Sequence, residues 1–245
     1  MSNSDARFVE QAFGFIDALE SDHLDIGTVT ARVAVLSKEC GYNYFTITRL
    51  PQPKLKLGPE MLLSQWSRPW LSYYDRVGLY RHDPIGRRCF ETALPFLWSD
   101  VRYSAEDHMA AKVMGEAAEH GMKAGFCVPM FGPSGFQAVA SFAGTEEAPS
   151  MARRRALHLV SIASYGWAER RELGRRDRQR ELLSPRERDV LAWTALGLNK
   201  ADVGERLGIA EVTVRTHIDR ARQKLGAANT LGAVVEALRR REVLL

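Results

Sequence analysis

The strongest constraint on this chain is the order of helix start and stop signals in its last 63 residues. Ser184 and Glu187 stand three positions apart and form a capping box, which predicts a helix start. Gly208 ends a second, short helix, and a longer basic helix follows after three residues. A short helix, a tight turn and a longer helix are typical of a helix-turn-helix. We expect helices over residues 185–196, 200–207, 211–225 and 230–241.

The third of these helices has two distinct faces. One face is apolar and should pack inward: Val214, Ile218, Ala221 and Leu225. The opposite face should meet base edges in the major groove: Val212, Arg215, Thr216, Asp219 and Arg220. Basic and hydroxyl side chains beside it should contact DNA phosphates: Lys200, Thr213, Arg222 and Lys224. The alternative is a helical hairpin with a salt-bridged surface, but cap, turn and basic face together favour DNA binding.

This region resembles the four-helix DNA-binding domain of the LuxR family. The resemblance is carried by L-S-P-R-E-R-D-V-L-A-W-x-A-x-G at 183–197, V-x-E-R-L-G-I at 203–209, T-V-x-T-H-I at 213–218 and K-L-G-A-A-N-T at 224–230. Ala210 departs from the pattern, because the family usually has a Ser or Thr there as helix cap. Losing such a cap costs about 1 kcal/mol, which Glu211 at the helix start partly offsets.

Charge and composition narrow the remaining possibilities. Residues 1–150 carry 14 basic and 18 acidic groups, a net charge of −4, and residues 151–245 carry 20 and 12, a net charge of +8. Only the second part is therefore expected to meet a polyanion. No apolar run approaches the roughly 20 residues that a membrane span needs. The three cysteines are far apart and form no CxxC motif, so we expect a cytoplasmic protein without disulfides or structural zinc.

The first part of the chain mixes helical and strand-like patterns. Apolar residues recur at helical spacing over 5–20, 26–38, 105–122 and 150–174, and strand-like runs cover 41–50, 125–131 and 136–143. The last two strands are separated by a Gly-Pro-Ser-Gly turn, which indicates a hairpin. We expect an α+β fold with an antiparallel sheet. The expected organisation is a domain over 1–174, a linker over 175–182 and an all-α domain over 183–245.

Eight aromatic side chains crowd between positions 66 and 98: Trp66, Trp70, Tyr73, Tyr74, Tyr80, Phe90, Phe96 and Trp98. Such a cluster alone is more often a core than a ligand cage. Asp83 changes this balance, because a buried carboxylate without a partner is costly. The N–H of a small molecule could supply that partner, and Trp and Tyr donors could bind its carbonyl groups.

The pattern W-x3-Y-x8-D-P-x10-P-F-x-W over 70–98, followed by G-x3-G-x3-P over 121–129, resembles the autoinducer-binding domain of quorum-sensing LuxR regulators. This resemblance implies an α-β-α sandwich enclosing an N-acyl homoserine lactone. It also implies that Trp70 donates to the lactone carbonyl, that Asp83 accepts the amide N–H, and that Tyr74 and Ser141 bind the acyl carbonyl. Trp98 would pack on the lactone ring.

One departure concerns Trp66, where the family usually has a tyrosine. An indole supplies no phenolic hydroxyl and takes up more space beside the amide. A flat aromatic or branched acyl group could stack on it, so we expect a compact acyl group; the alternative is that Trp66 turns outward. A plant-derived ligand on the same scaffold is the second alternative, although Trp70 and Tyr74 are retained, which favours a lactone.

An enzyme is the rival class. The six histidines show no metal-ligand spacing, and Cys127 is better explained as a buried side chain than as a nucleophile. We therefore expect no catalytic residue, metal or cofactor. The expected partners are a second copy of the chain, a two-fold-related promoter site, the autoinducer and RNA polymerase. Residues 151–174 and the apolar side chains of the last helix, Val234, Val235 and Leu238, are the expected dimer surfaces.

Overall fold

The computed structural model describes residues 2–20, 23–49, 57–104, 106–132, 135–145, 149–177, 182–240 and 242–243. The chain divides into two compact units, Met1–Arg171 and Glu172–Leu245. Residues 178–181 of the expected linker, Leu50 at the end of the expected first strand and residues 133–134 of the expected turn lie outside the described residues. Within the described part of the chain, no helix is long and apolar enough to cross a membrane.

The first unit is built on a five-stranded antiparallel sheet with the order β2-β1-β5-β4-β3. Its strands are β1 (Tyr44–Arg49), β2 (Met61–Ser64), β3 (Phe96–Leu97), β4 (Ala124–Gly132) and β5 (Gly135–Gly144). Its helices are α1 (Asn3–Ala18), α2 (Ile26–Glu39), α3 (Arg68–Val77), α4 (Pro84–Cys89), α5 (His108–Glu119) and α6 (Met151–Asp177). The expected helix over 150–174 therefore extends three residues further.

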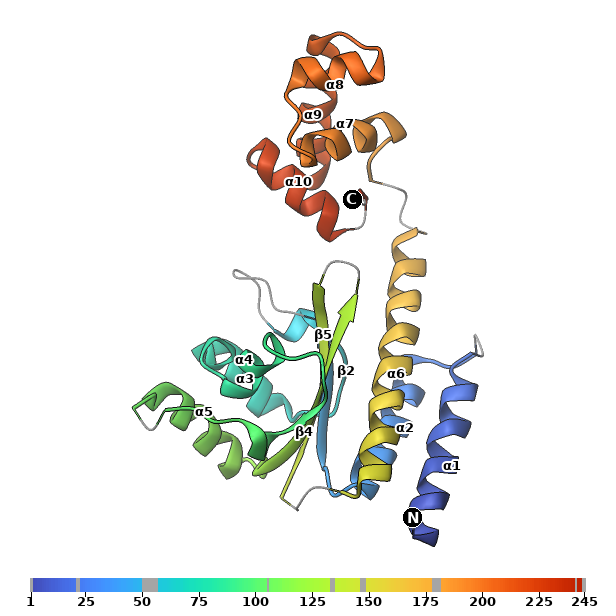
Figure 1. The fold of residues 1–245 in the computed structure, drawn as a ribbon, viewed down its shortest axis with the longest axis vertical. Coiled ribbons are helices and arrows are strands. Elements are labelled where there is room, and N and C mark those ends of the chain that lie inside the picture. The colour runs from blue at the N-terminus through green and yellow to red at the C-terminus, as the bar shows by residue number, and fades with distance from the viewer. Residues whose placement is uncertain are drawn as a thin grey trace. The chain divides into compact units, whose positions relative to one another are not determined.

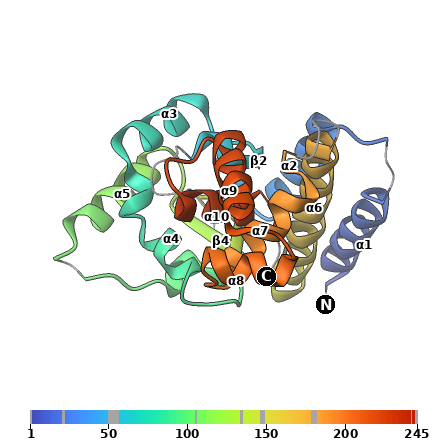
Figure 2. The same ribbon diagram turned by 90° about the horizontal axis from the view of Figure 1, so that it is seen from above.

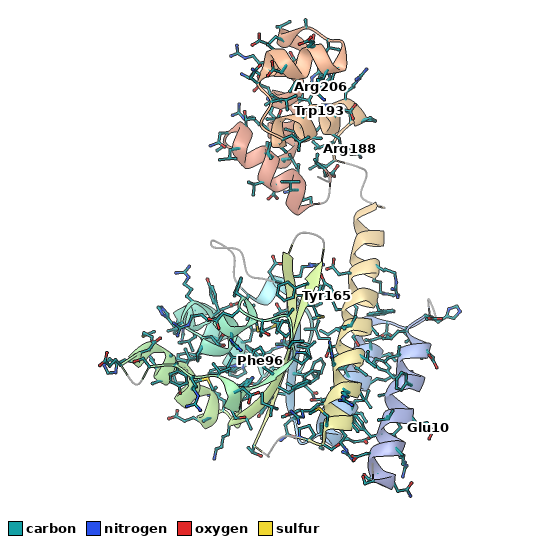
Figure 3. The ribbon with its side chains drawn as sticks, viewed as in Figure 1. Glu10, Phe96, Tyr165, Arg188, Trp193 and Arg206 are labelled. Atoms are coloured by element: carbon teal, nitrogen blue, oxygen red, sulfur yellow. The ribbon has the colours of Figure 1, made fainter. Side chains whose placement is uncertain are left out.

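The sheet separates two helical layers, with α1, α2 and α6 on one side and α3, α4 and α5 on the other (Figures 1 and 2). This is an α-β-α sandwich. Alternate side chains of each strand face opposite layers. On β1, Phe45 and Ile47 belong to the main core with α1, α2 and α6, whereas Thr46 and Thr48 face the other side. Figure 3 shows Tyr165 of α6 beside the sheet and Phe96 on the side of α3–α5.

Beyond the end of α6, the described residues of the second unit form four helices: α7 (Pro185–Ala195), α8 (Lys200–Leu207), α9 (Glu211–Leu225) and α10 (Thr230–Arg239). Ser184 caps α7 and forms the capping box with Glu187. Gly208 ends α8 in the left-handed conformation, at φ +65°. The inward face of α9 is buried as predicted, since Val214 and Ile218 pack with Val190 and Val203. The fold is the predicted combination of an α+β sandwich and an all-α helix-turn-helix unit.

Candidate functional site: a ligand cavity and a recognition helix

A cavity of about 480 Å³ lies on the α3–α5 side of the sheet. This volume falls in the range of small-molecule pockets, roughly 300–1,000 Å³. Its apolar wall includes Leu57, Ile85, Val113 and Val139. All six side chains that the sequence indicated as ligand contacts line it: Trp66, Trp70, Tyr74, Asp83, Trp98 and Ser141. These six side chains come from the segment after β2, from α3, from the start of α4, from the segment after β3 and from β5.

Trp70 lies in the first turn of α3, which begins at the cap Ser67. Its side chain is 2% exposed and packs on the His120 ring, with 4.7 Å between ring centroids. Among the described residues, nothing accepts a hydrogen bond from its indole N–H. A buried donor without a partner is costly, so this N–H is free to bind a carbonyl oxygen in the cavity.

Asp83 has three hydrogen-bond donors around it, and the expectation that it lacks a protein partner is wrong. It is the N-cap of α4: its Oδ1 accepts from the backbone N–H of Ile85 at 2.8 Å and of Gly86 at 3.3 Å. Its Oδ2 accepts from the Tyr74 hydroxyl at 2.7 Å. The pattern Asp-Pro starts a helix, which explains the cap. Because a carboxylate has about four acceptor sites, one remains for a further donor.

Burial governs the ionisation of this pair. It raises the pKa of Asp83 above its ordinary value, although the hydrogen bonds from Tyr74, Ile85 and Gly86 oppose the change. Burial and the neighbouring Asp83 carboxylate raise the pKa of Tyr74 well above its ordinary value. Tyr74 therefore keeps its proton and donates a hydrogen bond to Asp83. In this arrangement the hydroxyl has no second proton for a ligand carbonyl.

Trp98 and Ser141 are connected through a thiol. The Trp98 indole N–H donates to Cys127 Sγ at 3.4 Å, and the Cys127 thiol donates to Ser141 Oγ at the same distance. Trp98 lies close to the backbone at Gly125, where an added Cβ would be 2.4 Å from the indole ring. The thiol supplies the proton of its bond with Ser141, so the hydroxyl proton of Ser141 is available to an acceptor in the cavity.

Trp66 follows β2 and faces the cavity. Its ring lies nearly perpendicular to that of Tyr74, with 5.3 Å between centroids, and 6.2 Å from that of Trp70. The side chain is half-buried. The alternative in which Trp66 turns outward is therefore wrong, and the indole restricts the space beside Tyr74.

Other lining residues were missed from the sequence. Thr46, Thr48, Cys89 and Cys127 line the cavity, as do Arg81 and Arg87, whereas the side chain of Arg49 binds Glu169 of α6 on the other side of the sheet. A usable signal existed in β1, where polar Thr46 and Thr48 alternate with apolar Phe45 and Ile47. The positions on α4 carried no such signal, because a six-residue helix is too short for a periodic pattern.

In the second unit, α9 presents a polar face. Five side chains of the expected base-reading set are exposed: Val212, Arg215, Thr216, Asp219 and Arg220. Val212 reaches 70% exposure although it is apolar. Lys200 is exposed at the start of α8, and Thr213 is half-buried. The cap position Ala210 makes no side-chain hydrogen bond, as its sequence departure predicts.

Two of the expected phosphate contacts already have partners within the protein. Lys224 Nζ lies 2.7 Å from Glu187 Oε2, and Glu187 is 3% exposed. Arg222 binds Asp219 at 3.1 Å and the carbonyl of Ala228 at 2.8 Å. The contacts with Glu187 and Ala228 were not indicated by the sequence pattern, because Glu187 is distant in the chain and Ala228 lies in the following turn, whereas Asp219 lies one turn before Arg222 on α9.

The contacts of Glu187 determine the direction in which its pKa changes. Burial alone would raise the pKa of Glu187, but hydrogen bonds from Lys224 and Ser184 outweigh it, so the pKa lies below its ordinary value.

A second contact between helices of this unit involves an arginine and an aromatic ring: the Arg206 guanidinium lies 4.6 Å from the centroid of the Trp193 ring (Figure 3). This cation–π contact connects α8 to α7.

Comparison with known proteins agrees with both units. Residues 25–166 match the family model described as autoinducer binding domain, and residues 181–237 match that of bacterial regulatory proteins, luxR family. The chain is 35% identical to the HTH-type quorum sensing-dependent transcriptional regulator RpaR of Rhodopseudomonas palustris, over 93% of each chain. It is 34% identical to the transcriptional activator protein BjaR1 of Bradyrhizobium diazoefficiens, over 81% of this chain and 82% of the relative.

Solved structures show the same fold. A crystal structure of Escherichia coli SdiA has a TM-score of 0.74 at 20% identity and covers 97% of this chain and 100% of its own. SdiA in complex with octanoyl-rac-glycerol gives 0.73 at 19% identity, over 97% and 96%. The family and its relatives are transcriptional regulators and not enzymes. With an autoinducer-binding domain in front of a LuxR-type helix-turn-helix, the chain belongs to the LuxR family of quorum-sensing transcriptional regulators.

Proposed function

We propose that this regulator binds an N-acyl homoserine lactone in the cavity and, as a homodimer, binds a two-fold-related promoter site to control quorum-sensing genes. Residues 1–174 form the ligand-binding and dimerisation domain, and residues 183–245 form the DNA-binding domain. The cytoplasm is the compartment in which such a regulator meets DNA and RNA polymerase.

The observation that carries the ligand assignment is the complementarity of Trp70 and Asp83. Among the described residues, the cavity offers the buried N–H donor of Trp70, which has no acceptor, and the Asp83 carboxylate, which has a single remaining acceptor site. An acyl homoserine lactone supplies the matching groups, a ring carbonyl and an amide N–H. A compact aromatic or branched acyl group suits the half-buried Trp66 ring, which borders the same space.

Exposed apolar side chains support the dimer. On α6, Leu159 and Ile162 are 43% and 48% exposed, and on α10, Leu231 and Val235 are 72% and 56% exposed. Val234, which the sequence indicated as a surface contact, is instead buried in the core of its unit. A second copy that covers these faces would present two recognition helices to two half-sites.

Ligand-dependent stability tests the proposal. Purified full-length protein is heated with N-butanoyl, N-octanoyl and N-phenylacetyl homoserine lactone, and with flavonoids as plant-derived compounds. A ligand at 100 times its Kd stabilises the native state by about 2.7 kcal/mol. We expect stabilisation by at least one lactone, together with lactone-dependent binding of a dimer to promoter DNA. Stabilisation by a flavonoid alone would assign the plant-derived class instead.

A further inference from the structure

The floor of the cavity holds a polar row that the recognised ligand contacts do not account for. Thr46 of β1 pairs with Ser141 of β5 and with Ser64 of β2, and Ser141 pairs with Cys127 of β4. Directly opposite residues of an antiparallel pair point to the same face of the sheet. Thr46, Ser141 and Cys127 therefore lie side by side under the cavity, and all three line it.

Thr46 stands out in this row because its hydroxyl is unused. The side chain is 2% exposed, and its Oγ1 has no hydrogen-bond partner among the residues that the structure describes. The other members have partners: Ser64 Oγ accepts from the backbone N–H of Trp66, and Cys127 donates to Ser141. A buried hydroxyl without a partner costs roughly 1–3 kcal/mol, so a ligand atom that binds it is favoured.

Of the two side chains that the resemblance assigns to the acyl carbonyl, only Ser141 has a hydroxyl proton available for it. The Tyr74 hydroxyl donates its hydrogen bond to Asp83, and Trp66 carries no hydroxyl. Ser141 supplies one donor. Its neighbour Thr46 has its Cβ about 5 Å away, so one oxygen between them lies within hydrogen-bond reach, about 2.8 Å, of both hydroxyls.

We propose that Thr46 is a ligand-positioning residue whose hydroxyl, together with that of Ser141, binds the acyl carbonyl oxygen of the lactone. The assignment rests on the proposed function. Thr46 takes the place of a phenolic hydroxyl at position 66, because it lies on the sheet between Ser141 and Ser64, the residue that holds the Trp66 backbone.

The test compares Thr46→Val with Thr46→Ser and Thr48→Val in the full-length protein. Valine keeps the β-branched shape and removes only the hydroxyl, whereas serine keeps the hydroxyl. Thr48 is the matched control, since it lines the same cavity on the same strand but its hydroxyl already donates to the carbonyl of Arg49 at 3.0 Å. Stability without ligand and affinity for N-butanoyl, N-octanoyl and N-phenylacetyl homoserine lactone are measured for each.

For the lactone that binds wild type most tightly, Thr46→Val should lower affinity about 5- to 10-fold. Without ligand it should unfold at the same or a higher temperature, because an unused buried hydroxyl is gone. Thr46→Ser and Thr48→Val should stay within about twofold of wild type. Equal affinity in wild type and Thr46→Val, an equal loss in Thr48→Val, or a loss in Thr46→Ser would overturn the assignment. Failure of every lactone to bind wild type would overturn the proposed function as well.

Discussion

The Tyr74 hydroxyl donates a hydrogen bond to Asp83 Oδ2 across 2.7 Å. Because of this bond, two side chains that the sequence resemblance assigns to the ligand have different roles. Asp83 keeps a single acceptor site for an N–H donor, and Tyr74 holds the carboxylate in place. Because Asp83 also caps α4, the ligand amide would be recognised by the same group that starts a helix.

Asp83→Asn should weaken lactone binding by roughly 10- to 100-fold, since hydrogen bonds to charged groups contribute about 1.5–3 kcal/mol. Asparagine replaces one acceptor oxygen by an NH2 donor, so the ligand amide N–H and the Tyr74 hydroxyl compete for the one remaining oxygen. Tyr74→Phe is the contrast, because it removes a hydroxyl that already donates to Asp83; it should lower stability but keep most of the affinity. Tryptophan fluorescence titration measures both. Equal losses in the two variants would place Tyr74 in direct contact with the ligand.

Lactone affinity should depend on pH, because the charge of the Asp83 carboxyl changes with pH. Folding raises the pKa of this carboxyl above its ordinary value of 3.8, so in a window above 3.8 the native state holds a proton that the unfolded chain has released. The group therefore favours unfolding as the pH rises through this window. A ligand N–H needs the ionised form, so affinity should rise with pH through the same window and level off above it. Titrations at several pH values check this, and Asp83→Asn should abolish the dependence.

Arg215→Ala should relax the sequence preference of DNA binding and cost about 1–3 kcal/mol at the preferred site. Arg215 is exposed on the face of α9 that should meet base edges. Lys200→Ala should instead weaken binding to all sequences alike and reduce the salt dependence, as expected of a phosphate contact. Gel-shift titrations with specific and scrambled duplexes at two salt concentrations separate these outcomes. A uniform loss in Arg215→Ala would mean that it contacts only phosphates.

Lys224→Gln should lower the stability of the second unit by about 1–2 kcal/mol and change DNA affinity little. The lysine is 42% exposed, which screens its charge, but its partner Glu187 is nearly inaccessible to water. The folded pKa of Glu187 lies below its ordinary value of 4.5, so its contribution is present above pH 4.5 and is lost as the pH falls through the folded pKa. Urea unfolding of wild type and variant at neutral and acidic pH measures this contribution to the free energy of unfolding. A large loss of DNA affinity at unchanged stability would restore the phosphate role.

Trp66→Tyr should shift ligand preference toward longer chains. The wild-type indole occupies space beside Tyr74, and a flat acyl group stacked on it gains about 0.5–1.5 kcal/mol beyond area burial. Reporter dose–response curves with straight, branched and aryl lactones compare the two proteins. Highest potency of straight chains of about eight carbons or more in wild type would contradict the compact-acyl proposal.

The sequence predicted the elements with strong periodicity or caps and missed those defined by tertiary contacts. The helix-turn-helix followed from local signals, because Ser184, Gly208 and the apolar face of α9 lie within one stretch. The partner of Lys224 could not be predicted, since Glu187 lies 37 positions away. Local patterns identify which face of a helix is buried but not which charges meet across the core.

The same limit applies to the cavity. Motif spacing identified Trp70 and Asp83, but the bond from Tyr74 to Asp83 depends on how α3 and α4 pack. Thr46 was missed although its strand was predicted, because strand periodicity assigns a face without saying that the face lines a cavity. Only the pairing register shows that it stands beside Ser141.

Gly125 limits which substitutions the cavity wall can accept. A Cβ there would lie 2.4 Å from the Trp98 ring and 2.6 Å from the carbonyl oxygen of Phe142, so even alanine would displace the indole or the strand. A single substitution at Gly125 therefore cannot reshape the wall under Trp98 without moving the indole or the strand. At Thr46, by contrast, the hydroxyl has no partner among the described residues to lose. Substitutions along β1 can therefore alter the cavity with less disturbance than a substitution at Gly125, where the close contact with Trp98 must be kept.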